Sequence, residues 1–191
     1  MQFYFDPLSP WVYLAFKRIQ LLKKLGLSVQ FVPVSIFILH SFSPEGTGCV
    51  SYEHLMQEID EMKKEPYPFV VPTKFPFNTV LAQRLCVALE NESERQILED
   101  TLIESAWGKG LNLENEDHLK MIVLSLGINA EELWEKAFML EAKELLKHHS
   151  LRALQLGIHE LPALRVGDQI IQGKECLVFL DKTLLEYSEF S

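Results

Sequence analysis

The sequence predicts an α/β fold in which a helical segment interrupts a small sheet domain. Three observations support this prediction: a β-α-β pattern over residues 1–34, a helical pattern over residues 77–156, and a strand–turn–strand–helix pattern over residues 157–191. That order is typical of a thioredoxin-like fold with an inserted all-helical domain. We therefore expect a discontinuous thioredoxin-like domain, residues 1–76 and 157–191, and an inserted helical domain, residues 77–156.

The first pattern begins with the aromatic segment of residues 3–5, which favours a strand. Ser9 then offers an N-cap hydroxyl, and Pro10 suits the first position of a helix. Apolar residues follow at spacings of three and four until Gly26, which is typical of a helix C-terminus. Residues 28–34 complete the unit as a short buried strand.

The middle of the chain is irregular and then helical. Residues 35–77 are expected to connect the two domains, with a charged helix over residues 52–64 whose acidic run, residues 58–61, is solvated. Further helices are predicted over residues 79–90, capped by Asn78, from Ser93 through Trp107, and over residues 130–149, capped by Asn129 with Glu132.

The end of the chain returns to strands. Residues 161–166 and the pair Ile170-Ile171 flank the turn residues Gly167-Asp168, so a hairpin is predicted. Gly173 then precedes a final helix over residues 174–186.

Composition and charge exclude several classes of protein. The 191 residues are 48% hydrophobic and 24% charged, an ordinary globular mixture. Lys and Arg number 18 against 27 Asp and Glu, and the net charge of −9 is unfavourable for a nucleic-acid partner. The longest nearly apolar run, residues 31–39, is about half as long as a membrane-spanning helix, so no membrane association is expected.

The cysteines indicate a reducing compartment. Cys49, Cys86 and Cys176 are odd in number and far apart, which favours neither a disulfide framework nor a zinc site, and the histidines show no ligand spacing. The first residues resemble a strand rather than an export signal, so we expect a cytoplasmic protein. Cys86 fits a helical core position, and Cys49, in a glycine-rich loop, is the most plausible exposed thiol.

Two places in the sequence could support chemistry: Ser9-Pro10 and Leu161-Pro162. Unpaired N–H groups and the helix dipole at a helix start favour an anion such as a thiolate. Ser9 has no recognisable basic partner, so it suits hydrogen-bond donation to a thiol supplied by another molecule. The alternatives are structural: Ser9 as a simple N-cap, and Pro162 as an ordinary proline at the start of a strand.

Longer segments carry a family resemblance. The segment Phe3-Tyr4-Phe5-Asp6-Pro7-Leu8-Ser9-Pro10-Trp11 resembles the opening motif of 2-hydroxychromene-2-carboxylate isomerases and kappa-class glutathione transferases, within the DsbA-like thioredoxin superfamily. The resemblance continues through residues 67–72, residues 106–112, and residues 161–168 with the following Gly173. It therefore extends over nearly the whole chain.

The resemblance implies a glutathione site. Ser9 would be the catalytic residue that stabilises the glutathione thiolate, Pro162 would follow a cis peptide bond, and the backbone of Leu161 would pair with the peptide part of glutathione. Lys174 and Glu175 would hold the γ-glutamyl end. In the implied reaction the thiolate adds to a conjugated carbon of an aromatic or electrophilic substrate, the former double bond rotates, and elimination releases the isomer. The relatives also imply a homodimer.

The chain departs from the family pattern at two places. Cys176 stands where the family commonly has an arginine, and residues 41–57 contain neither the asparagine nor the lysine that the family uses. An alternative function is therefore a redox-inactive thioredoxin-fold binding protein that has lost effective glutathione binding. A dithiol oxidoreductase is not expected, because no resolving pair of cysteines accompanies Ser9.

Overall fold

A small mixed sheet lies at the centre of the molecule. The computed structural model describes residues 1–41 and 52–188, and within them the strands β1 (Gln2–Phe5), β2 (Gln30–Pro33), β3 (Ala163–Val166) and β4 (Gln169–Gln172) have the order β2-β1-β3-β4. β1 is parallel to β2 and antiparallel to β3, which pairs with β4 as a hairpin. The predicted β-α-β unit and C-terminal hairpin are both confirmed.

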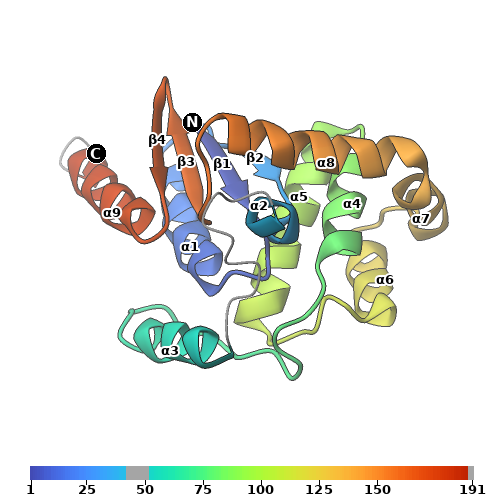
Figure 1. Ribbon diagram of the computed structural model, residues 1–191, viewed down its shortest axis with the longest axis horizontal. Helices are drawn as coiled ribbons and strands as arrows, with labels where there is room; N and C mark the ends of the chain where they lie inside the picture. Colours follow the sequence, from blue (N-terminus) through green and yellow to red (C-terminus); the bar gives the residue numbers. More distant parts are fainter. Residues whose placement is uncertain (42–51, 189–191) are drawn as a thin grey trace.

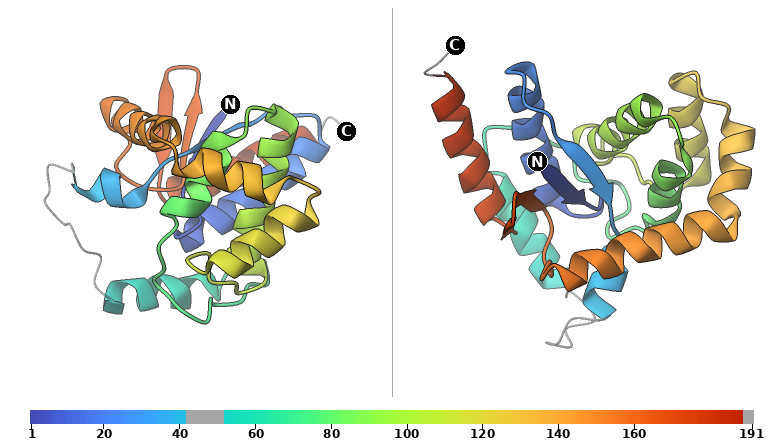
Figure 2. Two further views of the ribbon diagram at one scale, coloured as in Figure 1. Left: turned by 90° about the vertical axis from the view of Figure 1, so that its right-hand side faces the viewer. Right: turned by 90° about the horizontal axis from the view of Figure 1, so that it is seen from above.

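Helices cover both faces of this sheet (Figures 1 and 2). α1 (Pro10–Lys24) and α9 (Glu175–Ser188) pack together on one face, and α8 (Leu140–Gln155) runs along the other, in contact with β2 and with α2 (Ile36–Ser41). The remaining helical elements are α3 (Tyr52–Met62), α4 (Val80–Ala88), α5 (Glu92–Ile103) with a π-helical turn at Glu104–Gly108, α6 (Glu116–Ser125) and α7 (Ala130–Phe138). No helix of the described residues is long and apolar enough to cross a membrane.

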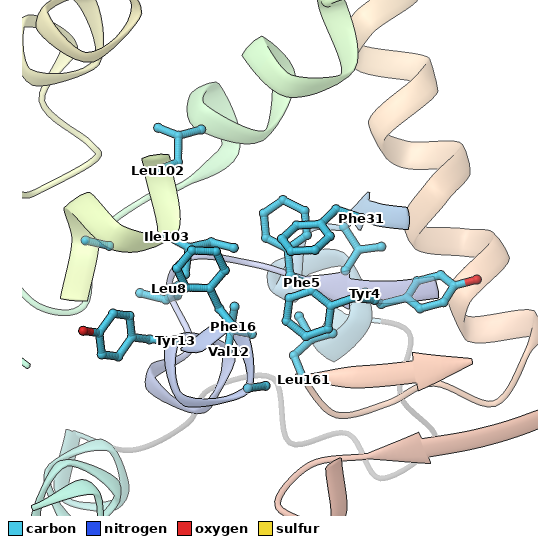
Figure 3. Close-up of a cluster of buried hydrophobic side chains, with 14 of the residues drawn as sticks. Tyr4, Phe5, Leu8, Val12, Tyr13, Phe16, Phe31, Leu102, Ile103 and Leu161 are labelled. Atoms are coloured by element: carbon cyan, nitrogen blue, oxygen red, sulfur yellow. The ribbon is translucent and has the colours of Figure 1, made fainter. Parts of the chain in front are cut away.

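Aromatic side chains form the core between the sheet and α1. The ring of Phe31 meets that of Phe3 edge-on at 5.0 Å between centroids and that of Phe16 at 6.4 Å. Successive residues of a strand point to opposite faces, and Figure 3 shows Tyr4 directed away from Phe5, toward α8. The face of the sheet toward α1 therefore carries phenylalanine rings. The face toward α8 carries the phenol ring of Tyr4.

A buried glutamine joins the helical segment to the sheet. The side-chain amide of Gln83, on α4, donates hydrogen bonds to the carbonyl oxygens of Phe5 at 2.9 Å and Val34 at 2.7 Å. These carbonyls lie at the C-terminal ends of β1 and β2. α4 therefore holds the end of β1, from which the chain continues to Ser9. The division into domains at residues 77 and 156 stays a prediction.

Several predicted helix boundaries are wrong. The helix expected from a Ser93 cap is capped by Asn91, whose side chain accepts from the N–H groups of Ser93 and Glu94. Asn129 accepts from the N–H of Glu132 as predicted, but the helix expected over residues 130–149 is interrupted at Met139, whose ψ of 160° is extended. α4 begins with Thr79 as its N-cap, and Asn78 assists by accepting from the N–H of Val80.

A helix also forms within the segment expected to be irregular. α2 begins at Ile36, whose N–H donates to the carboxylate of Asp6 at 2.9 Å. That acceptor is distant in sequence, so local pattern could not reveal this helix start.

Candidate active site

Ser9 lies where the chain passes from β1 into α1. Its N–H donates to the carbonyl of Asp6 at 3.0 Å, and its own carbonyl accepts from the N–H of Val12 at 3.2 Å. Pro10 occupies the first helical position as predicted. The side chain does not cap the helix, however, so the predicted N-cap role of the hydroxyl is wrong.

The Ser9 hydroxyl instead points to the second predicted place. It donates to the carbonyl oxygen of Leu161 at 3.3 Å, and the Leu161–Pro162 peptide bond is cis, as the resemblance implies. Both Ser9 and Leu161 are buried. A distance of 3.3 Å is long for a hydroxyl hydrogen bond, which is usually about 2.7–2.8 Å. The contact is therefore weak, and the hydroxyl can turn toward a better acceptor.

The Pro162 segment is held by the turn before α9. Gly173 donates its N–H to the carbonyl of Pro162 at 2.8 Å. Gly173 has a φ of +61°, and a Cβ there would collide with the carboxylate of Glu160. The positive φ favours glycine at this turn, whereas the exposed Glu160 side chain could move away from a Cβ. The Leu161 N–H donates no hydrogen bond to another group of the described residues.

The buried side chain of Cys176 contacts the same Pro162 segment from the core. Its Sγ lies 3.2 Å from the carbonyl oxygen of Pro162 and 3.1 Å from that of Ile171. Burial raises the pKa of the thiol to about 12, so it stays protonated and donates at neutral pH. Cys176 therefore packs in the core, and it adds neither a cation nor a reactive thiolate to the site.

Asp6 is a site residue that the sequence prediction missed. Its carboxylate is fully buried and accepts from the Leu8 N–H at 3.0 Å, the Ile36 N–H at 2.9 Å and the Thr79 hydroxyl at 2.7 Å. Desolvation raises the pKa of Asp6, and these hydrogen bonds oppose the rise. An acidic residue directly after a buried strand is a signal in itself, because burial of a carboxyl requires donors.

Two aromatic side chains hold the loop and α1 against the rest of the molecule. The indole N–H of Trp107 donates to the carbonyl of Pro7 at 2.9 Å, and the Tyr13 hydroxyl donates to the carbonyl of Pro68 at 2.8 Å. Burial, together with the charge of Glu104, raises the pKa of Tyr13 to about 12, so its hydroxyl remains a donor. Trp107 and Pro68 lie in two segments that carry the family resemblance.

Side chains of α1, of α3 and of the residue just before α9 contact one another. The indole N–H of Trp11 donates to Glu58 at 3.0 Å. The Lys174 ammonium lies 4.6 Å from the centroid of the Trp11 ring and pairs with Glu61. Glu58 and Glu61, in the acidic run expected to be solvated, are partly exposed and also contact Trp11 and Lys174.

Three further residues singled out in the sequence are Glu175, Cys86 and Cys49. Glu175 is exposed at the first position of α9. Cys86 is a buried core residue as predicted, and burial raises its pKa well above the usual value. Cys49 lies outside the described residues. Within residues 1–41 and 52–188, no cluster of three or more His, Cys, Asp or Glu could hold a metal ion.

Comparison with known proteins defines the class. Residues 1–185 match the family model of the DSBA-like thioredoxin domain, so the chain belongs to this family and the predicted fold class is confirmed. The match extends across both halves of the sheet and the helical segment between them.

The chain is also similar over nearly its full length to individual proteins of known structure or sequence. The chain is 23% identical to a 2-hydroxychromene-2-carboxylate isomerase of Sphingobium xenophagum, over 97% of this chain and 98% of the relative. The solved structure of a 2-hydroxychromene-2-carboxylate isomerase matches with a TM-score of 0.82 and 20% identity, covering 100% of this chain and 98% of the other. The cytosolic disulfide reductase DsbM from Pseudomonas aeruginosa, solved with GSH, matches with a TM-score of 0.67 and 15% identity over 96% and 98% of the two chains.

Proposed function

We propose that this protein is a glutathione-dependent isomerase in which Ser9 stabilises the thiolate of bound glutathione. The observation that carries the proposal is the contact of the Ser9 hydroxyl with the Leu161 carbonyl, beside a cis peptide bond. The similarity to a 2-hydroxychromene-2-carboxylate isomerase over almost the full length supports an enzyme of isomerase type. A related form of the proposal is the activity of a kappa-class-like glutathione transferase.

The residues around Ser9 fit a peptide-like thiol. The Leu161 backbone offers an N–H for strand-type pairing with the ligand. Lys174 supplies a cation and Glu175 an anion, which suit the carboxylate and ammonium groups of a γ-glutamyl end. Glutathione, when bound, would supply the thiolate nucleophile for reversible addition to a conjugated carbon of an aromatic or electrophilic substrate.

Ser9 would act by exchanging its hydrogen-bond acceptor. A serine hydroxyl has a single proton, so it can donate to the Leu161 carbonyl or to a thiolate but not to both. The contact at 3.3 Å is weak, whereas a hydrogen bond to a charged acceptor contributes about 1.5–3 kcal/mol. The exchange therefore favours the ionised ligand.

A binding protein without effective glutathione affinity is the second candidate. It is favoured by the Lys174 ammonium, which already pairs with Glu61, and by Cys176, which offers a buried neutral thiol where the family commonly has arginine. A ligand carboxylate would have to displace Glu61 from Lys174.

Calorimetric titration with glutathione, followed by an isomerisation assay with 2-hydroxychromene-2-carboxylate, tests the proposal. We expect binding by the wild type and activity that falls by about ten- to a hundredfold in Ser9→Ala, the loss expected for one charge-assisted hydrogen bond. Ser125→Ala is the matched control, because it removes a hydroxyl that donates to a backbone carbonyl on α6 at 2.7 Å. Absence of binding at several millimolar glutathione would favour the binding protein.

The proposal also includes a homodimer in the cytoplasm, where glutathione keeps thiols reduced. Light scattering on the purified protein measures the oligomeric state directly. A monomer would overturn the dimer and leave the role of Ser9 to its own test.

A further inference from the structure

A hollow lies on the face of the sheet opposite α1. It has a volume of about 390 Å³ and is bounded by β1, β2, β3 and α8, with α4 and α5 at its end. The phenol of Tyr4 lines it, and Figure 3 shows this side chain pointing toward α8. The hollow therefore lies at the seam between the sheet and the helical segment, a common location for small-molecule sites, which have volumes of about 300–1,000 Å³.

The lining of this hollow is cationic. Arg95, Arg152 and Arg165 line it together with His148 and His149, and none of its described lining residues is Asp or Glu. A protein with a net charge of −9 thus gathers basic side chains in one concave place. Such a concentration of one sign of charge in a concave surface attracts ions of the opposite sign.

The arginines contact mainly neutral acceptors. Arg95 donates to the Leu89 carbonyl at 3.3 Å, and Arg152 donates to the Gln155 side chain at 3.1 Å. Arg165 donates to the carbonyl of Gly167 at 3.1 Å and has an acid, Asp168, at 3.9 Å with a fully exposed side chain. Neutral acceptors leave the guanidinium charge uncompensated, and an exposed pair at that distance is weak.

Neighbouring titratable groups are consistent with a positive potential here. Burial lowers the pKa of His149, and the charges of His148 and Arg95 lower it further against the effect of a hydrogen bond to the Pro33 carbonyl. Burial raises the pKa of Glu99, which interacts with Arg95, to about 8. Glu99 is therefore mostly protonated at neutral pH and does not cancel the charge of Arg95.

We propose that this hollow binds a small organic dianion, with Arg152, Arg165 and Arg95 as its anion contacts. Guanidinium groups match carboxylate and phosphate oxygens with two parallel hydrogen bonds, and several of them around one cavity suit more than one anionic group. The apolar side chains of Val32, Leu145 and Leu156 also line the hollow, so the ligand combines its charges with an apolar body. This site is separate from Ser9 and does not depend on the proposed function.

Calorimetric titration with phthalate and with phenyl phosphate tests the site, since both are aromatic dianions but only one is a phosphate. We expect at least one of them to bind the wild type, and benzoate, a monoanion, to bind about tenfold more weakly. Tighter binding of phthalate would indicate a ligand with carboxylate groups. Tighter binding of phenyl phosphate would indicate a ligand with a phosphate group. Binding that weakens as salt rises is expected, because the contacts are charged.

Four variants locate the binding. Arg152→Gln and Arg165→Gln should each weaken the dianion about tenfold. Lys143→Gln is the matched control, because it removes one positive charge from an exposed residue of α8 that does not line the hollow. Ser9→Ala should leave the affinity within about twofold of the wild type.

Three results would overturn the proposal. One is no binding of either dianion up to about 10 mM, which is weaker than small-molecule sites of this size require. The second is equal weakening by Lys143→Gln and Arg152→Gln, which would indicate a general charge effect. The third is loss of binding in Ser9→Ala, which would place the dianion in the Ser9 site.

Discussion

The Ser9 site and the cationic hollow belong to the same sheet but offer an anion different partners. The proposed site would combine the Ser9 hydroxyl and backbone groups with the ammonium of Lys174, which already has the acidic partner Glu61. The hollow has guanidinium groups that contact mainly neutral acceptors. Hydroxyl and backbone dipoles, as at Ser9, stabilise an anion only at a particular position. Uncompensated guanidinium charges, as in the hollow, attract anions in general. If both proposals hold, the thiol and a dianion are recognised independently of each other.

The largest expected effect concerns the geometry of the Ser9 site. Asp6→Ala leaves the N–H groups of Leu8 and Ile36 and the Thr79 hydroxyl without their buried acceptor. We expect the free energy of unfolding to fall by about 3–5 kcal/mol, because each unsatisfied buried donor costs about 1–3 kcal/mol. Urea denaturation measures this change.

Asp60→Ala provides the control for Asp6. Its carboxylate pairs with Lys63 at the surface, and its side chain is 69% exposed. Such a pair contributes about 0–1 kcal/mol. If Asp6→Ala destabilises the protein no more than Asp60→Ala does, the Asp6 hydrogen bonds do not hold the loop.

The next effect concerns the pH dependence of stability at Glu99, which interacts with Arg95 of the hollow. Glu99 has a pKa of about 8 in the folded protein, above its ordinary value of 4.5. A raised folded pKa means that the stabilising contribution is present below the ordinary value and is lost as pH rises through the folded value. We expect the wild type to lose about 2–4 kcal/mol relative to Glu99→Gln between about pH 5 and pH 8.5.

Thermal or urea unfolding at both pH values measures the Glu99 effect. Glu94→Gln is the control, because Glu94 lies on the same helix and is exposed. A parallel pH dependence of the wild type and Glu99→Gln would show that Glu99 is ionised in the folded protein, and Arg95 would then have an acidic neighbour.

The smallest effect concerns the ion pair of Lys174 and Glu61. Glu61→Gln removes the carboxylate that pairs with Lys174, and we expect glutathione to bind about two- to threefold more tightly, since an exposed ion pair contributes about 0–1 kcal/mol. Lys174→Gln should weaken glutathione by a similar factor. Titration calorimetry of both variants, with Asp60→Asn as the control, measures these changes. If both variants weaken binding equally, the pair itself forms part of the glutathione site.

Much of the fold could be predicted from the sequence because it depends on local patterns. The strands around residues 3–5 and 161–172 follow from β-favouring residues and a glycine turn, and α1 follows from Pro10 and a periodic apolar face. The long helix expected over residues 130–149 failed because the interruption at Met139 involves neither proline nor glycine. Tertiary packing decides such positions, and local pattern does not report it.

The sequence predicts only part of the arrangement around Ser9, because local pattern does not report contacts between distant segments. Ser9 and Leu161 were identified, and the structure brings them into contact although 152 positions separate them. The direction of the Ser9 hydroxyl was predicted incorrectly, since the Leu161 carbonyl competes with the helix start. Asp6 and Glu61 were missed because their partners, Thr79 and Lys174, lie far away in sequence.

The acidity of glutathione bound to the wild type and to Ser9→Ala is the most direct test of the role of Ser9. Thiolate absorbance measured against pH gives the pKa of the bound thiol in each protein. The account predicts a pKa about one to two units higher in Ser9→Ala, equivalent to the loss of about 1.5–3 kcal/mol for one hydrogen bond to a charged group. An unchanged pKa in the variant, with glutathione still bound, would contradict it.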